Sequence, residues 1–301
     1  MNRICKICKR IARGSWKTAL TAVLVVSAVL SVADVRAQDP AEKKLGWFLK
    51  ASVGWVWLGG NSESNSYALG AEARRVWENS ELLLKAGGTQ TESSSITRTA
   101  VGTANDYVMQ ESKQTEKTAE LYYARARYDY SFSKWFFAFG GADWLRNRFA
   151  GIDSRELVAL GAGNTWADRG DLRFKTDYGV TYTFEEEVVE NPFLKSNFPG
   201  ARLGYDFWWK LTGTTEFSSL FVADFNLDNT KDIRIDCKNE LPVSISDNLK
   251  FKPALQFLWR NDPALTEVEL FDAGGTSTGT KVRVPLEELD TIFTVSLVFE
   301  M

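Results

Sequence analysis

The sequence predicts an all-β fold: an antiparallel transmembrane β-barrel of about 12 strands, of the Gram-negative outer-membrane type. Three observations lead to this prediction. A basic segment and an apolar run open the chain, and about twelve later segments alternate apolar and polar residues. The links between those segments are short and long by turns. Together these patterns indicate an exported chain that crosses a membrane with strands.

The amino terminus has the order of features found in secretory signal peptides. Six basic residues lie within the first 17 positions, ahead of an uncharged apolar run over 18–33. That run is 16 residues long, short of the roughly 20 that a membrane-spanning helix needs. It is followed by Val35-Arg36-Ala37, a small-x-small cleavage pattern. We therefore expect residues 1–37 to be a cleaved signal peptide, rather than a retained anchor, and residues 38–301 to be a single barrel domain.

Composition removes several function classes. The 301 residues include no histidine, which is the commonest general base, the commonest zinc ligand and the middle member of a Ser-His-Asp triad. Loss of residues 1–37 takes away seven of the 36 Lys and Arg and one of the 39 Asp and Glu, leaving 29 against 38 and a net charge of −9. Cys237 is then the only thiol. We expect no enzyme activity, no cofactor, no metal site and no nucleic-acid partner.

The strands are recognised by a period of two. The clearest case is Leu172 to Phe184, where apolar residues at even positions alternate with polar or small residues over 13 residues. Similar segments lie near 46–58, 64–77, 80–90, 116–130, 135–147, 155–167, 171–184, 198–210, 215–227, 231–243, 248–260 and 286–301. Strands of soluble proteins run to about five or six residues and membrane-spanning strands to about nine to eleven, so these segments belong to the longer class. Pro253 cannot donate to a strand ladder and predicts a bulge or a misplaced boundary.

The links predict which ends of the strands face outward. Outer-membrane barrels join strands by short periplasmic turns and longer outer loops. Short links fall at 78–79, 131–134, 168–171, 211–214 and 244–248. The longer links between them fall at 91–115, 148–154, 185–197 and 261–285, with two shorter ones at 59–63 and 228–230. In the link 185–197 we expect Glu185, Glu186, Glu187 and Glu190 to form a solvated acidic loop rather than a divalent-cation site.

Tryptophan placement is consistent with a barrel, because aromatic rings favour the two membrane interfaces. Most tryptophans of the exported chain lie near predicted strand ends, at Trp55, Trp57, Trp77, Trp135, Trp144, Trp166, Trp208, Trp209 and Trp259.

The polar faces of the strands place charges of both signs inside the barrel, because charged side chains cannot face lipid. The candidate lumen-facing residues are Arg125, Arg127, Asp129, Arg173, Lys175, Asp177, Arg202 and Asp206. Two interpretations remain open: an interior cross-linked by ion pairs, and a hydrated pore whose charge rows select solutes.

Several short motifs carry a resemblance to a known family. They are Gly60-Asn61-Ser62 after the first strand, Asp143 with Arg148-Phe149-Ala150-Gly151-Ile152-Asp153-Ser154-Arg155, Leu160-Gly161-Ala162-Gly163, and Gly179 with Tyr182. Over about residues 47–301 the chain resembles the salt-induced outer-membrane proteins catalogued as domain of unknown function 481. The resemblance implies an outer-membrane barrel of undefined biochemical role and supplies no catalytic residues.

The expected function is therefore that of a non-enzymatic outer-membrane barrel with a mixed-charge lumen and a structural role in the envelope, linked to salt or osmotic stress. Its expected partners are outer-membrane lipid, lipopolysaccharide and, during biogenesis, the barrel assembly machinery. One alternative is a narrow, porin-like channel for small solutes, and another is a soluble periplasmic β-rich binding protein.

The signal-peptide pattern gives a first testable prediction. The exported protein should begin at Gln38, because the small-x-small site ends at Ala37. Amino-terminal sequencing of the protein from the membrane fraction checks this. A mature chain that starts at Met1 would contradict both the cleavage and the export argument.

Overall fold

Long alternating segments form the strands of one antiparallel sheet. The computed structural model describes residues 44–58, 63–103, 106–191 and 194–300, so the expected signal peptide lies outside the described residues. The first strands are β1 (Gly46–Leu58), β2 (Glu63–Val76), β3 (Ser80–Thr103), β4 (Asp106–Ser131), β5 (Phe136–Asn147), β6 (Ile152–Asp168) and β7 (Leu172–Glu187). They are followed by β8 (Asn197–Lys210), β9 (Glu216–Asn226), β10 (Ile233–Glu240), β11 (Val243–Ser246), β12 (Leu249–Arg260), β13 (Leu265–Phe271), β14 (Ser277–Pro285) and β15 (Leu289–Glu300).

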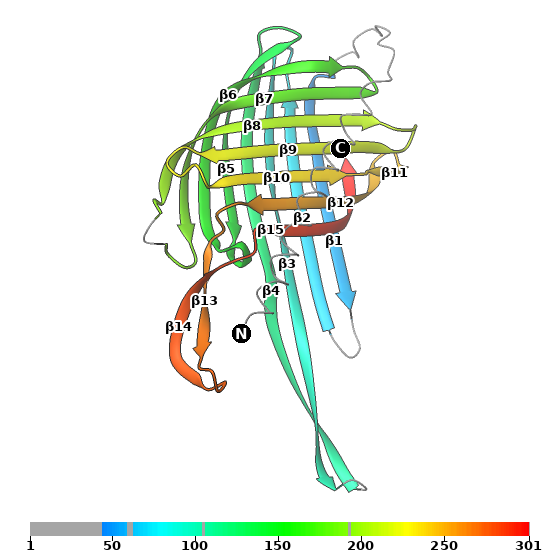
Figure 1. Ribbon diagram of the computed structural model, residues 1–301. Coiled ribbons are helices and arrows are strands. Elements are labelled where there is room, and N and C mark those ends of the chain that lie inside the picture. The colour runs from blue at the N-terminus through cyan, green and yellow to red at the C-terminus, as the bar shows by residue number, and fades with distance from the viewer. Residues whose placement is uncertain (1–43, 59–62, 104–105, 192–193, 301) are drawn as a thin grey trace, which may run out of the picture. The chain divides into compact units, whose positions relative to one another are not determined.

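The sheet closes on itself. Successive strands pair from β1 to β10, β10 pairs with β12, β12 with β15, and β15 with β1. The predicted barrel of twelve strands is therefore confirmed, with the short β11 as a continuation of β10 (Figure 1). All the pairings are antiparallel, as the alternation of short turns and long loops requires.

Two prolines explain why β10 and β11 are separate. Pro253 lies within β12 and its carbonyl accepts from the Leu241 N–H at 3.0 Å, so its nitrogen also points toward the β10–β11 side. The strand facing it is interrupted there by Leu241 and Pro242. The N–H that Pro253 lacks would thus point at the break between β10 and β11. On the other side of β12, the pairing with β15 continues without interruption past Pro253.

The two ends of the barrel differ in their connections. The turns after β2, β4, β6, β8 and β11 contain two to five residues, and we call this the short-turn end. The opposite end, which we call the long-loop end, carries the connections after β5, β7, β9 and β12. Short turns face the periplasm in outer-membrane barrels. Figure 1 shows β3, β4, β13 and β14 extending beyond the barrel at the long-loop end.

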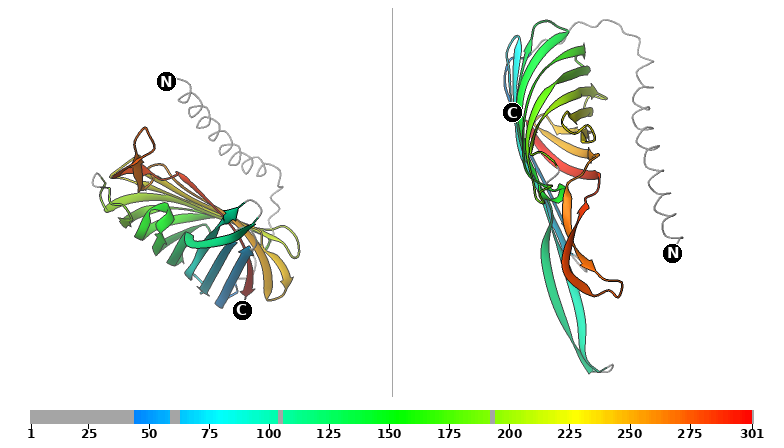
Figure 2. Two further views of the ribbon diagram at one scale, coloured as in Figure 1. Left: turned by 90° about the horizontal axis from the view of Figure 1, so that it is seen from below. Right: turned by 60° about the vertical axis from the view of Figure 1, so that its left-hand side comes forward.

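Two expected loops are strands instead. β3 and β4 have 24 and 26 residues, and their register runs to Thr103 opposite Asp106, beyond the point where β2 and β5 stop. The expected loop 91–115 is therefore mostly a two-stranded ribbon (Figure 2). The expected loop 261–285 contains the β13–β14 hairpin. Outside a membrane, backbone pairing needs no apolar face, which is why the apolar alternation did not reveal these strands.

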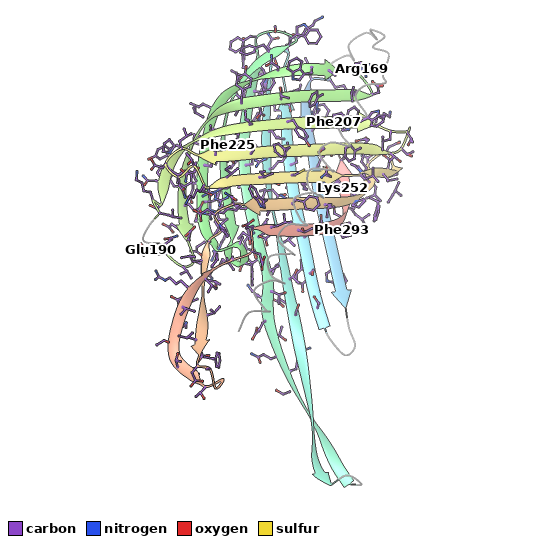
Figure 3. The ribbon with its side chains drawn as sticks, in the orientation of Figure 1. Arg169, Glu190, Phe207, Phe225, Lys252 and Phe293 are labelled. Carbon is purple, nitrogen blue, oxygen red and sulfur yellow. The ribbon has the colours of Figure 1, made fainter. Side chains whose placement is uncertain are left out.

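The outer face of the barrel is apolar. Val180 on β7 is 63% exposed. Phe293 on β15 is 68% exposed (Figure 3). Exposed tryptophans lie toward both ends, with Trp47, Trp166 and Trp209 near the short turns and Trp144 near the long loops. Among the described residues no helix is long and apolar enough to cross a membrane, which bears on helices alone. A closed barrel with this exterior is a Gram-negative outer-membrane barrel.

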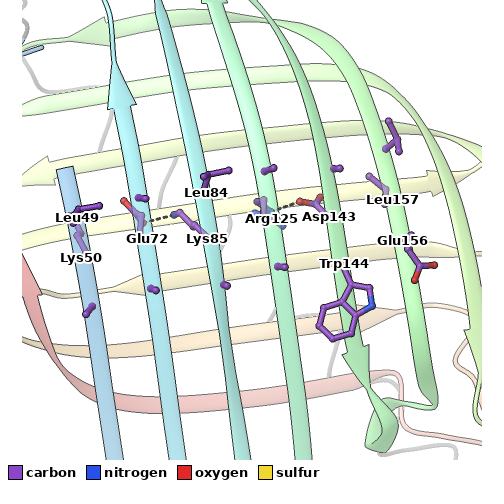
Figure 4. A pocket seen from close by; sticks show the side chains of 18 residues that line it. Leu49, Lys50, Glu72, Leu84, Lys85, Arg125, Asp143, Trp144, Glu156 and Leu157 are labelled. Carbon is purple, nitrogen blue, oxygen red and sulfur yellow. Dashed lines mark hydrogen bonds and ion pairs between the residues drawn. The ribbon is translucent and has the colours of Figure 1, made fainter. Parts of the chain in front are cut away.

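A row of alanines crosses the outer face of β1 to β4. Ala51, Ala71, Ala86 and Ala124 lie directly opposite one another in register. They contribute to a shallow apolar groove of about 730 Å³ (Figure 4).

The assignment of faces predicts unequal effects for two substitutions in β7. Val180→Arg puts a charge on the lipid-facing side and should cost about 2–4 kcal/mol of folding free energy, the range for Arg near the bilayer midplane. Lys175→Gln should cost much less, because it removes a charge from the polar interior. Urea unfolding from lipid vesicles measures both. A harmless Val180→Arg would mean that no lipid lies beside this position.

Candidate functional site

The interior of the barrel is the candidate functional site. It contains a cavity of about 630 Å³ whose lining includes 12 basic and 12 acidic residues. They are Lys50, Arg74, Lys85, Arg125, Arg155, Arg173, Arg202, Arg234, Lys238, Lys250, Lys252 and Arg260, with Glu72, Glu81, Asp143, Asp206, Glu216, Asp224, Asp236, Glu240, Glu287, Glu288, Asp290 and Glu300. The lining therefore carries equal numbers of acidic and basic side chains.

One class of ion pair joins neighbouring strands. Lys85 Nζ of β3 lies 3.0 Å from Glu72 Oε2 of β2, and Arg125 Nε of β4 donates to Asp143 Oδ1 of β5 at 2.6 Å (Figure 4). These partners stand side by side on the inner face because inward positions of paired strands are in register. Each pair links two adjacent strands of the barrel.

A second class of ion pair crosses the interior between strands that are not neighbours. Arg127 Nη1 of β4 lies 2.7 Å from Asp177 Oδ2 of β7, and Arg202 Nη1 of β8 lies 3.0 Å from Asp143 Oδ2 of β5. In both cases the two strands are three positions apart around the ring. Arg202 also donates from Nε to Asp224 of β9 at 2.7 Å, so its guanidinium is held from two sides. We call these contacts cross-lumen pairs.

The densest group of charges lies at the long-loop end and consists of Arg155, Glu185, Glu187, Asp232, Arg234 and Arg260, which we call the Glu185 cluster. Glu185 accepts from three guanidiniums, those of Arg155 at 2.6 Å, Arg234 at 2.7 Å and Arg260 at 2.9 Å. These come from β6, β10 and β12, while Glu185 is on β7.

Two more carboxylates complete the Glu185 cluster. Asp232 Oδ2 lies 2.5 Å from Arg234 Nη2, and Glu187 Oε1 lies 3.0 Å from Arg260 Nη2. The side chains of Glu185 and Asp232 are 4% and 2% exposed. The expectation of a solvated acidic loop is thus wrong for Glu185: β7 continues through Glu187, and strand parity turns Glu185 inward, leaving Glu186 exposed outside.

The remaining expected lumen residues also lie on the inner wall. Asp129 accepts from Arg127 Nε at 2.7 Å, and Arg173 Nη2 lies 3.4 Å from Asp206. Lys175 stacks its ammonium over the Phe137 ring at 5.6 Å. Phe137 belongs to a small buried apolar cluster with Phe139, Leu157 and Ala159 on the inner faces of β5 and β6.

Sequence reasoning missed several interior groups. Trp208 was expected at an interface, but its Nε1 donates to Glu216 Oε2 at 3.0 Å and it lines the cavity. It lies next to Trp209, which is exposed, and parity separates the two. Glu72, Asp143 and Glu185 were missed as partners, because pairing between distant strands depends on the register of the whole ring.

A family model and the sequence of one bacterial protein match this chain. The family model described as "Protein of unknown function, DUF481" matches residues 51–273. The chain is also similar to the uncharacterized protein YdiY of Escherichia coli K12, with 22% identity over 228 residues that cover 75% of this chain and 79% of the relative.

Solved structures that match do so at low similarity. The translocator domain of the autotransporter NalP from Neisseria meningitidis matches with a TM-score of 0.41 and 12% identity, covering 94% of this chain and 97% of that one. An anion-selective porin from Comamonas acidovorans matches with a TM-score of 0.37 and 9% identity, covering 86% and 100%. The barrel is defined by its own strand pairing.

The contacts of Glu185 predict a large difference between adjacent carboxylates. Glu185→Gln leaves three buried guanidiniums without their shared counter-charge and should lower the free energy of unfolding by about 3–5 kcal/mol. The matched control, Glu186→Gln, changes an exposed side chain and should stay within about 0.5 kcal/mol. Urea unfolding of both variants in lipid vesicles measures this. Equal effects would contradict the assigned geometry.

Proposed function

The chain belongs to the DUF481 family of proteins of unknown function, and on that premise we propose that it is a non-enzymatic structural barrel of the outer membrane whose interior is locked by ion pairs. In this function the barrel reinforces the envelope and passes little or no solute. The absence of histidine from the sequence supports a role without catalysis.

The cross-lumen pairs are the observation that carries this proposal. A side chain that reaches a partner three strands away fills the space between the two walls, as Arg127 does with Asp177 and Arg202 with Asp143. The Glu185 cluster adds such contacts at the long-loop end. A wide channel needs this space for water and solute, so the pairs favour a closed barrel over a conducting one.

A link to salt or osmotic stress is part of the proposal and follows from the family resemblance. Its physical support is that salt screens exposed charges strongly and buried pairs much less. The ion pairs of the Glu185 cluster are withdrawn from solvent, so they would keep the barrel closed as external ionic strength rises. Measurement of the protein level after a salt shift tests the link.

The proposed partners follow from the location. The exposed apolar belt would contact membrane lipid, and the long-loop end would meet lipopolysaccharide in the outer leaflet. Assembly of a closed barrel would use the barrel assembly machinery.

A narrow channel for small solutes is the second candidate. It is favoured by the cavity of about 630 Å³, which is lined by charges of both signs along the barrel. Such a lining would admit small polar molecules with little preference for one sign of charge. Conduction separates this candidate from the closed barrel.

Planar bilayer recording tests the closed barrel directly. The wild-type protein should give no steady single-channel steps, whereas a variant that lacks two cross-lumen pairs, Arg127→Ala with Arg202→Ala, should give steps because water replaces the two guanidiniums. The control is Lys195→Ala, which removes a surface pair with Asp228 at 2.7 Å and should remain silent. Steady steps from the wild-type barrel would select the channel instead.

A further inference from the structure

The two ends of the charged interior differ in which of their charged groups are exposed. Near the short turns Asp206, Lys50 and Arg173 keep 46%, 39% and 33% of their side-chain surface exposed. At the long-loop end the carboxylates of Glu185 and Asp232 are almost fully buried. The exposed carboxylates that line the cavity there, Glu287 and Glu288, belong to the segment between β12 and β15. Solvent therefore reaches the ionic wall from the short-turn end.

A connection covers the long-loop end. The segment between β12 and β15 crosses to the opposite side of the ring, where Ala264 and Leu286 meet Gly151 between β5 and β6. The contact is close, because a Cβ at Gly151 would lie 2.4 Å from the Ala264 Cβ. Gly151 also has a φ of +76°, a backbone conformation that glycine adopts without strain, so both the space and the backbone favour glycine here. Ala264 is 2% exposed.

Hydrogen bonds fix this cover in place. Leu286 N–H donates to the Ala264 carbonyl at 2.9 Å, and Asn261 N–H donates to the Ile233 carbonyl at 3.0 Å. Pro263, Ala264 and Glu287 line the cavity from this side. Beneath them lies the Glu185 cluster, so the long-loop end is closed by two layers, one of backbone and apolar groups and one of ion pairs.

Two guanidiniums near the short-turn end of the cavity have N–H donors that lack a hydrogen-bond acceptor. Among the residues that the structure describes, the Nε atoms of Arg74 and Arg173 are buried and have no hydrogen-bond acceptor. Their ion pairs are also long, at 3.9 Å from Arg74 to Glu81 and 3.4 Å from Arg173 to Asp206. By contrast, Arg202 is held by Asp224 at 2.7 Å.

These two guanidiniums come from different walls of one cavity. Arg74 is on β2 and Arg173 on β7, both line the same cavity, and Glu81 is within electrostatic reach of both. In the lining from β10 and β12, Lys238 and Lys252 share one carboxylate, Glu240, at 2.9 and 3.1 Å. Buried donors without acceptors are costly unless a ligand or water meets them, and guanidiniums select the planar oxygens of carboxylate and phosphate.

We propose that the barrel is a blind chamber, open at the periplasmic short-turn end and closed at the cell surface, which binds a small carboxylate- or phosphate-bearing solute on Arg74 and Arg173. The inference rests on the proposed function, because a conducting barrel has no blind end. It adds a ligand class and a direction of access to that function.

Solute binding is tested by isothermal titration of the folded barrel in lipid nanodiscs with succinate and with inorganic phosphate. At least one of the two should bind the wild type, and Arg74→Gln with Arg173→Gln should weaken that binding about tenfold or more, since each change removes a charge-assisted hydrogen bond. Arg173→Lys keeps the charge and should fall between them. The matched control is Arg169→Gln. The Nε of Arg169 is likewise buried without an acceptor, but Arg169 does not line the cavity. No binding of either probe, or an equal loss in the control, would overturn the ligand assignment.

The direction of access is tested by single-cysteine labelling in sealed vesicles. In a chain with Cys5, Cys8 and Cys237 replaced by serine, Ser218→Cys places a thiol in the cavity on β9 near the short turns. An anionic, membrane-impermeant thiol reagent should label it only in molecules whose short-turn end faces the outside of the vesicle. These molecules are identified by external protease, which cannot reach their β3–β4 ribbon inside the vesicle. Thr278→Cys on the β14 hairpin should be labelled in the opposite orientation.

The outcomes separate the two proposals. Labelling of Ser218→Cys in both orientations would show a through-channel and overturn the closed barrel together with the blind chamber. Labelling in one orientation without solute binding would leave the closed barrel standing and overturn the ligand assignment alone.

Discussion

The structure depends on one constraint: in a lipid interior, which contains no water, every backbone N–H and C=O must find its partner within the protein. A sheet satisfies this only when its two edges meet, and here β15 returns to β1 to close the ring. Closure in turn fixes which side chains face lipid and which face inward, because parity along each strand cannot change without a bulge. The apolar exterior and the charged interior are therefore two results of the same pairing.

The charged interior raises a second requirement, which is charge compensation. A guanidinium enclosed by twelve strands needs a counter-charge or water. Pairs between adjacent strands such as Lys85 with Glu72 provide this locally, whereas Arg202 reaches both β9 and β5. The cross-lumen pairs thus join walls that share no backbone hydrogen bonds. They connect strands that are three positions apart in the ring.

The sequence predicted the twelve barrel strands because lipid on one side and polar groups on the other impose a period of two, most clearly in Leu172 to Phe184. It did not predict the β3–β4 ribbon or the β13–β14 hairpin, which lie beyond the barrel, where no apolar face is required. Parity could assign Arg127 and Asp177 to the interior but could not pair them, because their strands are three positions apart and their meeting depends on the register of every strand between. Glu185 shows the same limit, since its acidic neighbours suggested a solvated loop.

The seam between the first and last strands has a consequence for how the chain is made. Among the described residues, β1 and β15 are joined over four residue pairs, from Lys50 opposite Glu300 to Val53 opposite Leu297, whereas β1 and β2 are joined over 13. The two sides of the seam come from opposite ends of the barrel sequence, so β1 exposes an unpaired edge until the final strand has been synthesised and delivered. Such an edge invites pairing with other chains. The edge of β1 therefore needs protection during assembly until β15 reaches it, and the Lys50–Glu300 contact at 2.8 Å lies within the pairing that covers this edge.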